Sequence, residues 1–219
     1  KDTVMSYNIG PNGWDEWFSI TDIQALKSIW GREDDSGSMK FDKKSKNYNF
    51  KYDVNESLFI NSEIGYEPIN NVENLIFDDR VLNVKKDIES VFNELVSIDH
   101  ITGKIYRLYN AAFGRFPDID GFKYWIKKNI SNENSYYQTV ESFIHSDEFI
   151  HLYFTTDSEK EYLSSLYNNV FNREPDINGY NYWLNQLESN NESKSDVLIG
   201  FSESIENKEI FATQTSILA

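Results

Sequence analysis

Apolar residues in the second half of the chain recur with the spacing of an α-helix, and they do so twice. Ile105, Leu108, Tyr109, Ala112 and Phe113 fall at positions i, i+3, i+4, i+7 and i+8, which places them on one helical face. The same spacing returns 58 residues later at Leu163, Leu166, Tyr167, Val170 and Phe171. The pattern predicts two copies of one helical unit.

Each of these helices is followed by the residues of a tight turn. In the first copy Gly114 can adopt a left-handed C-cap, Pro117 prevents the helix from continuing, and Asp118 can cap a second helix. The second copy repeats these positions as Asn172, Pro175 and Asp176. Phe122 and Trp125 lie on the second helix, and Phe143 lies on a third. Each unit is therefore predicted to contain three helices.

The first half of the chain has a different pattern, typical of β-strands. Alternating or continuous apolar runs cover residues 47–54, 57–61, 72–77 and 81–84, and Asp78-Asp79 predicts a hairpin between the last two. Turn-forming residues separate the runs: Asn55, Gly65, Pro68, Asn70 and Asn71.

These patterns predict an α+β protein with a β-rich module at residues 1–86 and a helical repeat domain at 87–219. The β-rich module contains an inserted aromatic segment at about residues 10–45, with a short helix near 22–30. A helix at residues 87–98 joins the two parts.

Composition excludes several functions. The chain has 36 acidic and 21 basic residues, a net charge of -15 and no cysteine. Nucleic acid is a poor partner because phosphates repel such a chain, and thiol chemistry is excluded. No apolar stretch is long enough to predict a membrane span. Aromatic residues make up 16% of the chain and can form a substantial core, so the acids are expected at the surface.

The repeated pattern, LY-x3-F-[GN]-R-x-PD-x2-G-[FY]-x-YW followed by F-x2-S-x-E, resembles the bacterial domain-of-unknown-function family 4214 over about residues 101–212. The resemblance implies an all-helical module attached to large exported bacterial surface proteins. The motif residues are Tyr109, Phe113, Gly114, Arg115, Pro117, Asp118, Gly121, Trp125, Tyr167, Phe171, Asn172, Arg173, Pro175, Asp176, Gly179 and Trp183.

A second resemblance lies in the first half. NNVENLIFDDRVLNV at residues 70–84, with DTVMSYN at 2–8, is similar to the segment that closes haemolysin-type (RTX) calcium-repeat arrays of type I secreted proteins. The glycine-rich nonapeptides that bind calcium in such arrays are absent from this sequence. The resemblance implies an extracellular or cell-surface location.

Two short acidic stretches are candidates for calcium binding. Asp118 and Asp120 in DIDG, with Asp176 and Asn178 in DING, resemble part of an EF-hand loop. The first and twelfth ligand positions of that loop are not matched, so helix capping is the favoured interpretation. Arg115 and Arg173 are expected to brace the turns rather than to clamp an anion.

The leading hypothesis is a non-catalytic structural or adhesion module of an exported bacterial protein, such as an adhesin, surface layer or extracellular filament. Its expected partners are other surface-protein subunits or cell-surface polysaccharide, with no cofactor and calcium as the candidate ion. One alternative is a carbohydrate-binding module in which Trp14 and Trp17 stack on sugars. The other is an extracellular polysaccharide hydrolase that uses paired acids.

Overall fold

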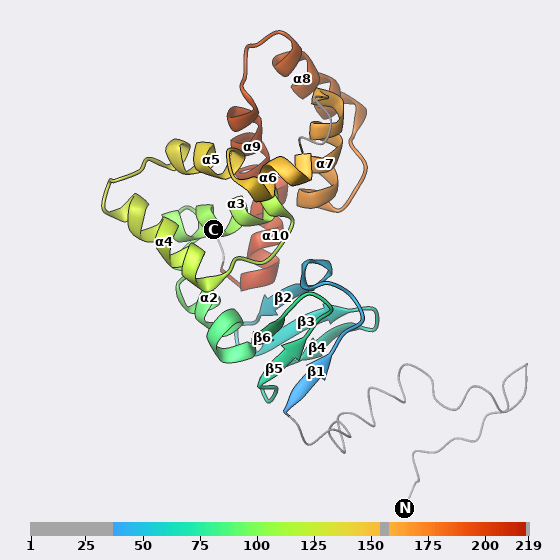
Figure 1. The fold of residues 1–219 in the computed structure, drawn as a ribbon, viewed down its shortest axis with the longest axis vertical. Coiled ribbons are helices and arrows are strands. Elements are labelled where there is room, and N and C mark those ends of the chain that lie inside the picture. The colour runs from blue at the N-terminus through green and yellow to red at the C-terminus, as the bar shows by residue number, and fades with distance from the viewer. Residues whose placement is uncertain (1–36, 154–157, 218–219) are drawn as a thin grey trace, which may run out of the picture. The chain divides into compact units, whose positions relative to one another are not determined.

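The computed structural model describes residues 37–153 and 158–217. Residues 39–219 form one compact unit, which holds the elements below except the first residue of β1. Figure 1 shows small β-sheets followed in the chain by helices, which confirms the α+β layout. Trp14, Trp17 and the helix expected near 22–30 lie outside the described residues.

In the described residues, six short strands form two three-stranded sheets. The first has the order β1-β5-β6, and the second has the order β2-β3-β4. The strands are β1 (Ser38–Lys40), β2 (Asn49–Tyr52), β3 (Leu58–Ser62), β4 (Gly65–Pro68), β5 (Asn74–Ile76) and β6 (Val81–Asn83). β5 and β6 pair antiparallel with Ile76 opposite Val81, so Asp78-Asp79 forms the expected hairpin.

Two strands correct the prediction. β4 contains Gly65 and Pro68, which the sequence assigned to turns, yet it pairs antiparallel with β3. Pro68 is tolerated because β4 is an edge strand, where one row of backbone N–H groups needs no partner. β1 lies within the expected insertion at 10–45, and its Met39 is buried in the core of the strands.

The joining helix, predicted at residues 87–98, both begins and ends earlier than predicted. A π-helical turn at Val84–Glu89 continues into α2 (Ser90–Asn93), and Asn83 caps the start by accepting a hydrogen bond from the backbone N–H of Lys86. Ile88 and Phe92 pack into the core of the strands, whereas Val91 packs into the core of the helices. This segment therefore belongs to both cores. A 3-10 turn, η1, covers Ser45–Asn47 between β1 and β2.

The helical part contains a fourth helix in each unit, one more than expected. The first unit has α3 (Ile101–Phe113), α4 (Ile119–Ile130), α5 (Tyr136–Ile144) and α6 (Asp147–Tyr153). The second has α7 (Glu159–Phe171), α8 (Ile177–Glu188), α9 (Lys194–Ser202) and α10 (Ile205–Thr215). Ser146 and Ser204 begin the added helices by accepting backbone N–H groups.

The predicted caps are confirmed. Gly114 and Asn172 are left-handed, with φ of 58° and 51°. The carboxylates of Asp118 and Asp176 accept hydrogen bonds from the backbone N–H groups of Gly121 and Gly179, at 2.7 and 2.8 Å. The chain reverses at these turns because the left-handed residue ends one helix and the aspartate begins the next.

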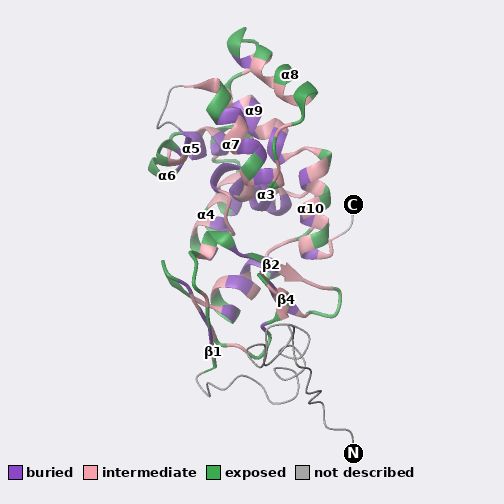
Figure 2. Ribbon diagram, turned by 90° about the vertical axis from the view of Figure 1, so that its right-hand side faces the viewer, coloured by how far each residue is buried: buried purple, intermediate pink, exposed green. Residues whose placement is uncertain are grey.

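α3 lies at the centre of the helical part, where buried residues cover most of its length (Figure 2). It packs against α4, α5 and α6 of its own unit and against α7, α9 and α10 of the other unit. The strands contact the helical part at the turn between α3 and α4, where the centre of the Phe116 ring lies 4.9 Å from that of Phe50. Within the described residues, no helix is long and apolar enough to cross a membrane.

Candidate functional site

The two turns of the repeat hold a network centred on an arginine. Arg115 donates to both carboxylate oxygens of Glu148 at 2.6 and 2.9 Å, and to the carbonyl oxygen of Phe116 at 3.2 Å. Its guanidinium also lies 3.6 Å from the carboxylate of Asp118. A bidentate pair of this kind fixes the orientation of both side chains. Arg115 thus ties the turn to the start of α6.

The second unit repeats the same contacts. Arg173 donates to both carboxylate oxygens of Glu206 at 2.9 and 2.7 Å, and to the carbonyl oxygen of Glu174 at 3.1 Å. These hydrogen bonds hold the pKa of Glu206 below its ordinary value. Both arginines therefore brace their turns, as expected from the sequence. The prediction did not identify the glutamate partners, although both lie in the repeated F-x2-S-x-E segment.

Each turn also places a tyrosine hydroxyl against a glycine. A Cβ atom on Gly121 would lie 2.5 Å from the hydroxyl oxygen of Tyr109, and a Cβ atom on Gly179 would lie 2.5 Å from that of Tyr167. Burial raises the pKa of Tyr167 to about 12, and the nearby carboxylate of Asp176 contributes further. A side chain at either position would therefore force the tyrosine hydroxyl or the capping carboxylate to shift.

Aromatic rings complete the network beneath each arginine. The guanidinium of Arg115 lies 5.4 Å from the centre of the Tyr109 ring and 5.3 Å from that of Phe113. Arg173 lies at 5.3 and 5.2 Å from the corresponding rings of Tyr167 and Phe171. Such cation–π contacts add to the hydrogen bonds. The arginines, tyrosines, phenylalanines, aspartates and glycines of the motif therefore contact one another inside each unit.

The four candidate calcium ligands do not come together as a metal site. Asp118 and Asp176 cap α4 and α8, while Asp120 and Asn178 are exposed in the first turns of these helices. The hydrogen bond from the Gly179 backbone holds the pKa of Asp176 below its ordinary value. In the part of the chain that the structure describes, no group of three or more His, Asp or Glu side chains could hold a metal ion.

A cleft of about 380 Å³ lies between the β5–β6 hairpin and the first turn. Asp79, Arg80, Arg115, Asp118 and Asp120 are among its lining residues. Two of these carboxylates already have partners. Asp79 accepts hydrogen bonds from the backbone and the hydroxyl of Ser45, and Asp118 caps α4. The cleft is thus lined by charges of both signs that take part in the fold.

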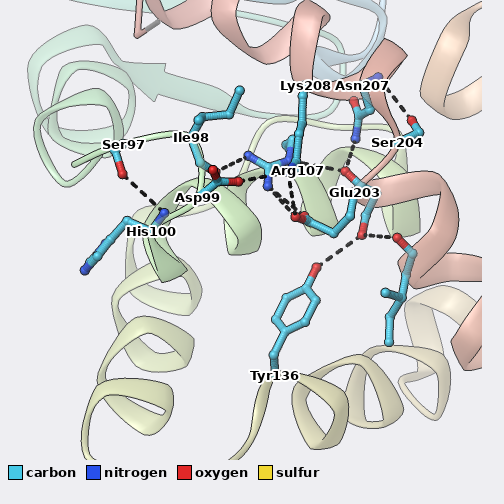
Figure 3. A network of polar contacts seen from close by, with 12 residues as sticks. Ser97, Ile98, Asp99, His100, Arg107, Tyr136, Glu203, Ser204, Asn207 and Lys208 are labelled. Atoms are coloured by element: carbon cyan, nitrogen blue, oxygen red, sulfur yellow. Dashed lines mark hydrogen bonds and ion pairs between the residues drawn. The ribbon is translucent and has the colours of Figure 1, made fainter. Parts of the chain in front are cut away.

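A further network lies where the two units meet, around Arg107 on α3 (Figure 3). The Arg107 side chain is 1% exposed and donates to both carboxylate oxygens of Glu203, at 2.8 and 2.7 Å. It also donates to the carbonyl oxygens of Ile98 at 2.7 Å and Ser202 at 3.2 Å. Sequence analysis did not identify this site. The available signal was a break in the repeat, since the position matching Arg107 is Ser165.

Comparison with known proteins places the two helical units in one family. The chain belongs to the family described as Domain of unknown function (DUF4214), whose model matches residues 101–153 and 140–211, together just over half of the chain. The matches fall on the two helical units. No curated protein and no solved structure matches the chain.

Proposed function

We propose that this protein is a non-catalytic structural or adhesion module of an exported bacterial cell-surface protein. The observation that carries the proposal is the use of the repeated motif. Its arginines, aspartates, glutamates and tyrosines hold the turns together in both copies. A repeat whose polar residues serve its own scaffold acts by presenting an outer surface to partners.

The distribution of charge supports the same proposal. No Asp or Glu is among the buried residues of the described part of the chain, so the acids of that part lie at or near the surface. Such an exterior can bind calcium diffusely and can meet surface-protein subunits or cell-surface polysaccharide. The hairpin at residues 70–84, similar to the end of RTX calcium-repeat regions, favours export by a type I secretion route.

Protease treatment of intact cells of the source bacterium tests the location. An antibody raised against residues 39–217 follows the chain, and a cytosolic enzyme serves as the control for lysis. We expect the chain to be degraded on intact cells while the cytosolic enzyme survives. If the chain resists protease until the cells are lysed, the proposal of a surface location is wrong.

A deletion of the encoding gene tests the adhesive role. Loss of attachment to surfaces or to neighbouring cells, restored by the intact gene, is the expected result. Release of reducing sugar from extracellular polysaccharide by the purified chain would contradict the non-catalytic proposal and favour the hydrolase instead.

A further inference from the structure

One side of α8 carries four uncharged, exposed residues, and the exposed Glu188 follows them at the C-terminal end of the same side. Asn178, Asn181, Tyr182 and Asn185 fall at i, i+3, i+4 and i+7, so they share one side of the helix, and all four are exposed. Within the described residues, none of these four side chains has a hydrogen-bond partner. Ile177, 75% exposed, borders the same face. α8 packs mainly against α7, and most of its length is intermediate or exposed (Figure 2).

The matching face in the first unit, on α4, differs from that of α8. The matching face of α4 consists of Asp120, Lys123, Tyr124 and Lys127, all of them exposed. The tyrosine is kept in both copies, whereas the three charged residues of this face of α4 are replaced by asparagine on α8. Asparagine is a poorer helix former than lysine, so helix stability does not account for the replacement. We expect a role in recognition instead.

Tyr182 presents an open aromatic ring on this face. It is 54% exposed, and its ring stands edge-on to Trp183 with the ring centres 5.1 Å apart. The centre of the Trp183 ring lies 6.0 Å from that of Phe201 in the core, so Trp183 packs between the exposed Tyr182 ring and the core. Tyr124 has the same arrangement with Trp125, but the ammonium of Lys128 lies over its ring at 5.6 Å.

From this face we infer that α8 binds a neutral polysaccharide, with Tyr182 stacking on a sugar ring and the three asparagines bonding to hydroxyl groups. An amide side chain both donates and accepts hydrogen bonds, which suits hydroxyl groups that do the same. From residue 178 to residue 185 the helix rises about 10 Å, the length of a short oligosaccharide. An acidic polymer is disfavoured because the chain carries a net charge of -15.

This inference rests on the proposed function, because it names polysaccharide as the partner of the surface module. Affinity electrophoresis tests it with the whole chain, in native gels containing dextran, mannan or hydroxyethyl cellulose as neutral probes and alginate as the acidic probe. We expect at least one neutral polymer to retard the chain and alginate to leave it unretarded. Tyr182→Ala is expected to weaken the retardation about ten-fold, the effect of losing one good contact.

The first unit supplies the matched control. Tyr124→Ala makes the same truncation on α4 and is expected to leave retardation unchanged. The double variant Asn181→Lys with Asn185→Lys gives α8 the residues of α4 and should abolish binding while circular dichroism shows an intact helical content. Three outcomes overturn the inference: no retardation by any neutral polymer, an unchanged Tyr182→Ala variant, or an equal loss in Tyr124→Ala.

The location experiment separates the two proposals. A chain that is degraded on intact cells but is not retarded in any gel refutes polysaccharide binding by α8 and leaves the surface module standing. A chain that is retarded in gels but protected from protease in intact cells supports polysaccharide binding by α8 and refutes the surface location.

Discussion

Arg107, which is buried, and Glu203, which is 19% exposed, form an ion pair that joins one helical unit to the other. The two residues lie on α3 and directly after α9, and the matching positions in the opposite copies are Ser165 and His145. The pair is therefore not part of the repeated scaffold. It occurs once, at the junction, where it also satisfies the carbonyl oxygens of Ile98 and Ser202.

Removing one partner of this pair is expected to destabilise the fold strongly. Arg107→Met takes the guanidinium away from the Glu203 carboxylate and leaves the carbonyl oxygen of Ile98 without its donor. The expected cost is about 3 kcal/mol in the free energy of unfolding, the lower end of the range for a buried pair, because Glu203 is 19% exposed and Lys208 lies 3.9 Å away. The matched substitution Ser165→Met, at the equivalent partly exposed position of α7, should change stability by less than about 0.5 kcal/mol. Urea unfolding followed by circular dichroism measures both.

The coupling between the two residues gives a second prediction. Adding Glu203→Leu to Arg107→Met removes the unpaired carboxylate, so the double variant should be more stable than the sum of the single changes implies, by about 1–3 kcal/mol. Recovery is incomplete because the carbonyl oxygen of Ile98 stays without its donor, whereas that of Ser202 still accepts from the Asn207 amide. Additive single effects would show that Arg107 acts through packing and its carbonyl contacts alone.

The glycine of each turn can be tested in the same way. Gly121→Ala forces a Cβ atom toward the Tyr109 hydroxyl and the Asp118 carboxylate, and such overpacking costs about 1–3 kcal/mol. Tyr109→Phe removes the nearer of the two atoms, so it should recover part of the loss. Lys127→Ala on the exposed side of the same helix is the control. If Gly121→Ala proves neutral, the close approach of α3 and α4 is not a constraint.

The sequence predicted what is local in this fold. Helical spacing, the left-handed residues Gly114 and Asn172, and the capping aspartates all act within a few positions of one another, so they can be read directly from the chain. The 58-residue repeat strengthened these predictions, because the same kinds of residue occur at the matching positions of both turns. The same locality made the β5–β6 hairpin predictable from Asp78-Asp79.

Contacts between distant segments could not be predicted from such patterns. Arg107 and Glu203 are 96 positions apart, and neither periodicity nor capping links them. The glutamates that pair with Arg115 and Arg173 lie 33 positions downstream. Although they recur in both copies, no local pattern links them to the arginines, so the pairing was not predicted. β4 was missed because glycine and proline favour turns locally, whereas pairing with β3 decides the outcome.

The turn networks also predict a dependence of stability on pH. The folded pKa of Glu206 lies below its ordinary value of 4.5 because Arg173 donates to it. Its stabilising contribution is therefore complete above pH 4.5 and is lost as the pH falls through the lower folded value. The pair is partly exposed, so the contribution is under about 1 kcal/mol.

Urea unfolding at pH 7, 5, 4 and 3 measures this effect. Glu206→Gln should lower stability at pH 7 and flatten the decline between pH 5 and 3, because glutamine cannot titrate. Glu209→Gln, an exposed substitution on the same helix, should leave the profile parallel to that of the unmodified chain. A Glu206→Gln profile parallel to the unmodified one would mean that other acids govern the loss of stability.

Calcium provides the sharpest test of the two interpretations of DIDG. If Asp118 serves only as a helix cap, Asp118→Ala costs about 1 kcal/mol whether calcium or a chelator is present, and Asp120→Ala costs little in either condition. If the stretch binds calcium, both substitutions also remove the stabilisation that calcium adds, so each costs more in calcium than in chelator. Thermal unfolding in chelator or in about 5 mM calcium, a concentration above the dissociation constants of weak extracellular calcium sites, distinguishes them. We expect the capping result, together with a gradual rise in melting temperature that magnesium reproduces, because a diffuse acidic exterior responds to divalent charge rather than to one ion.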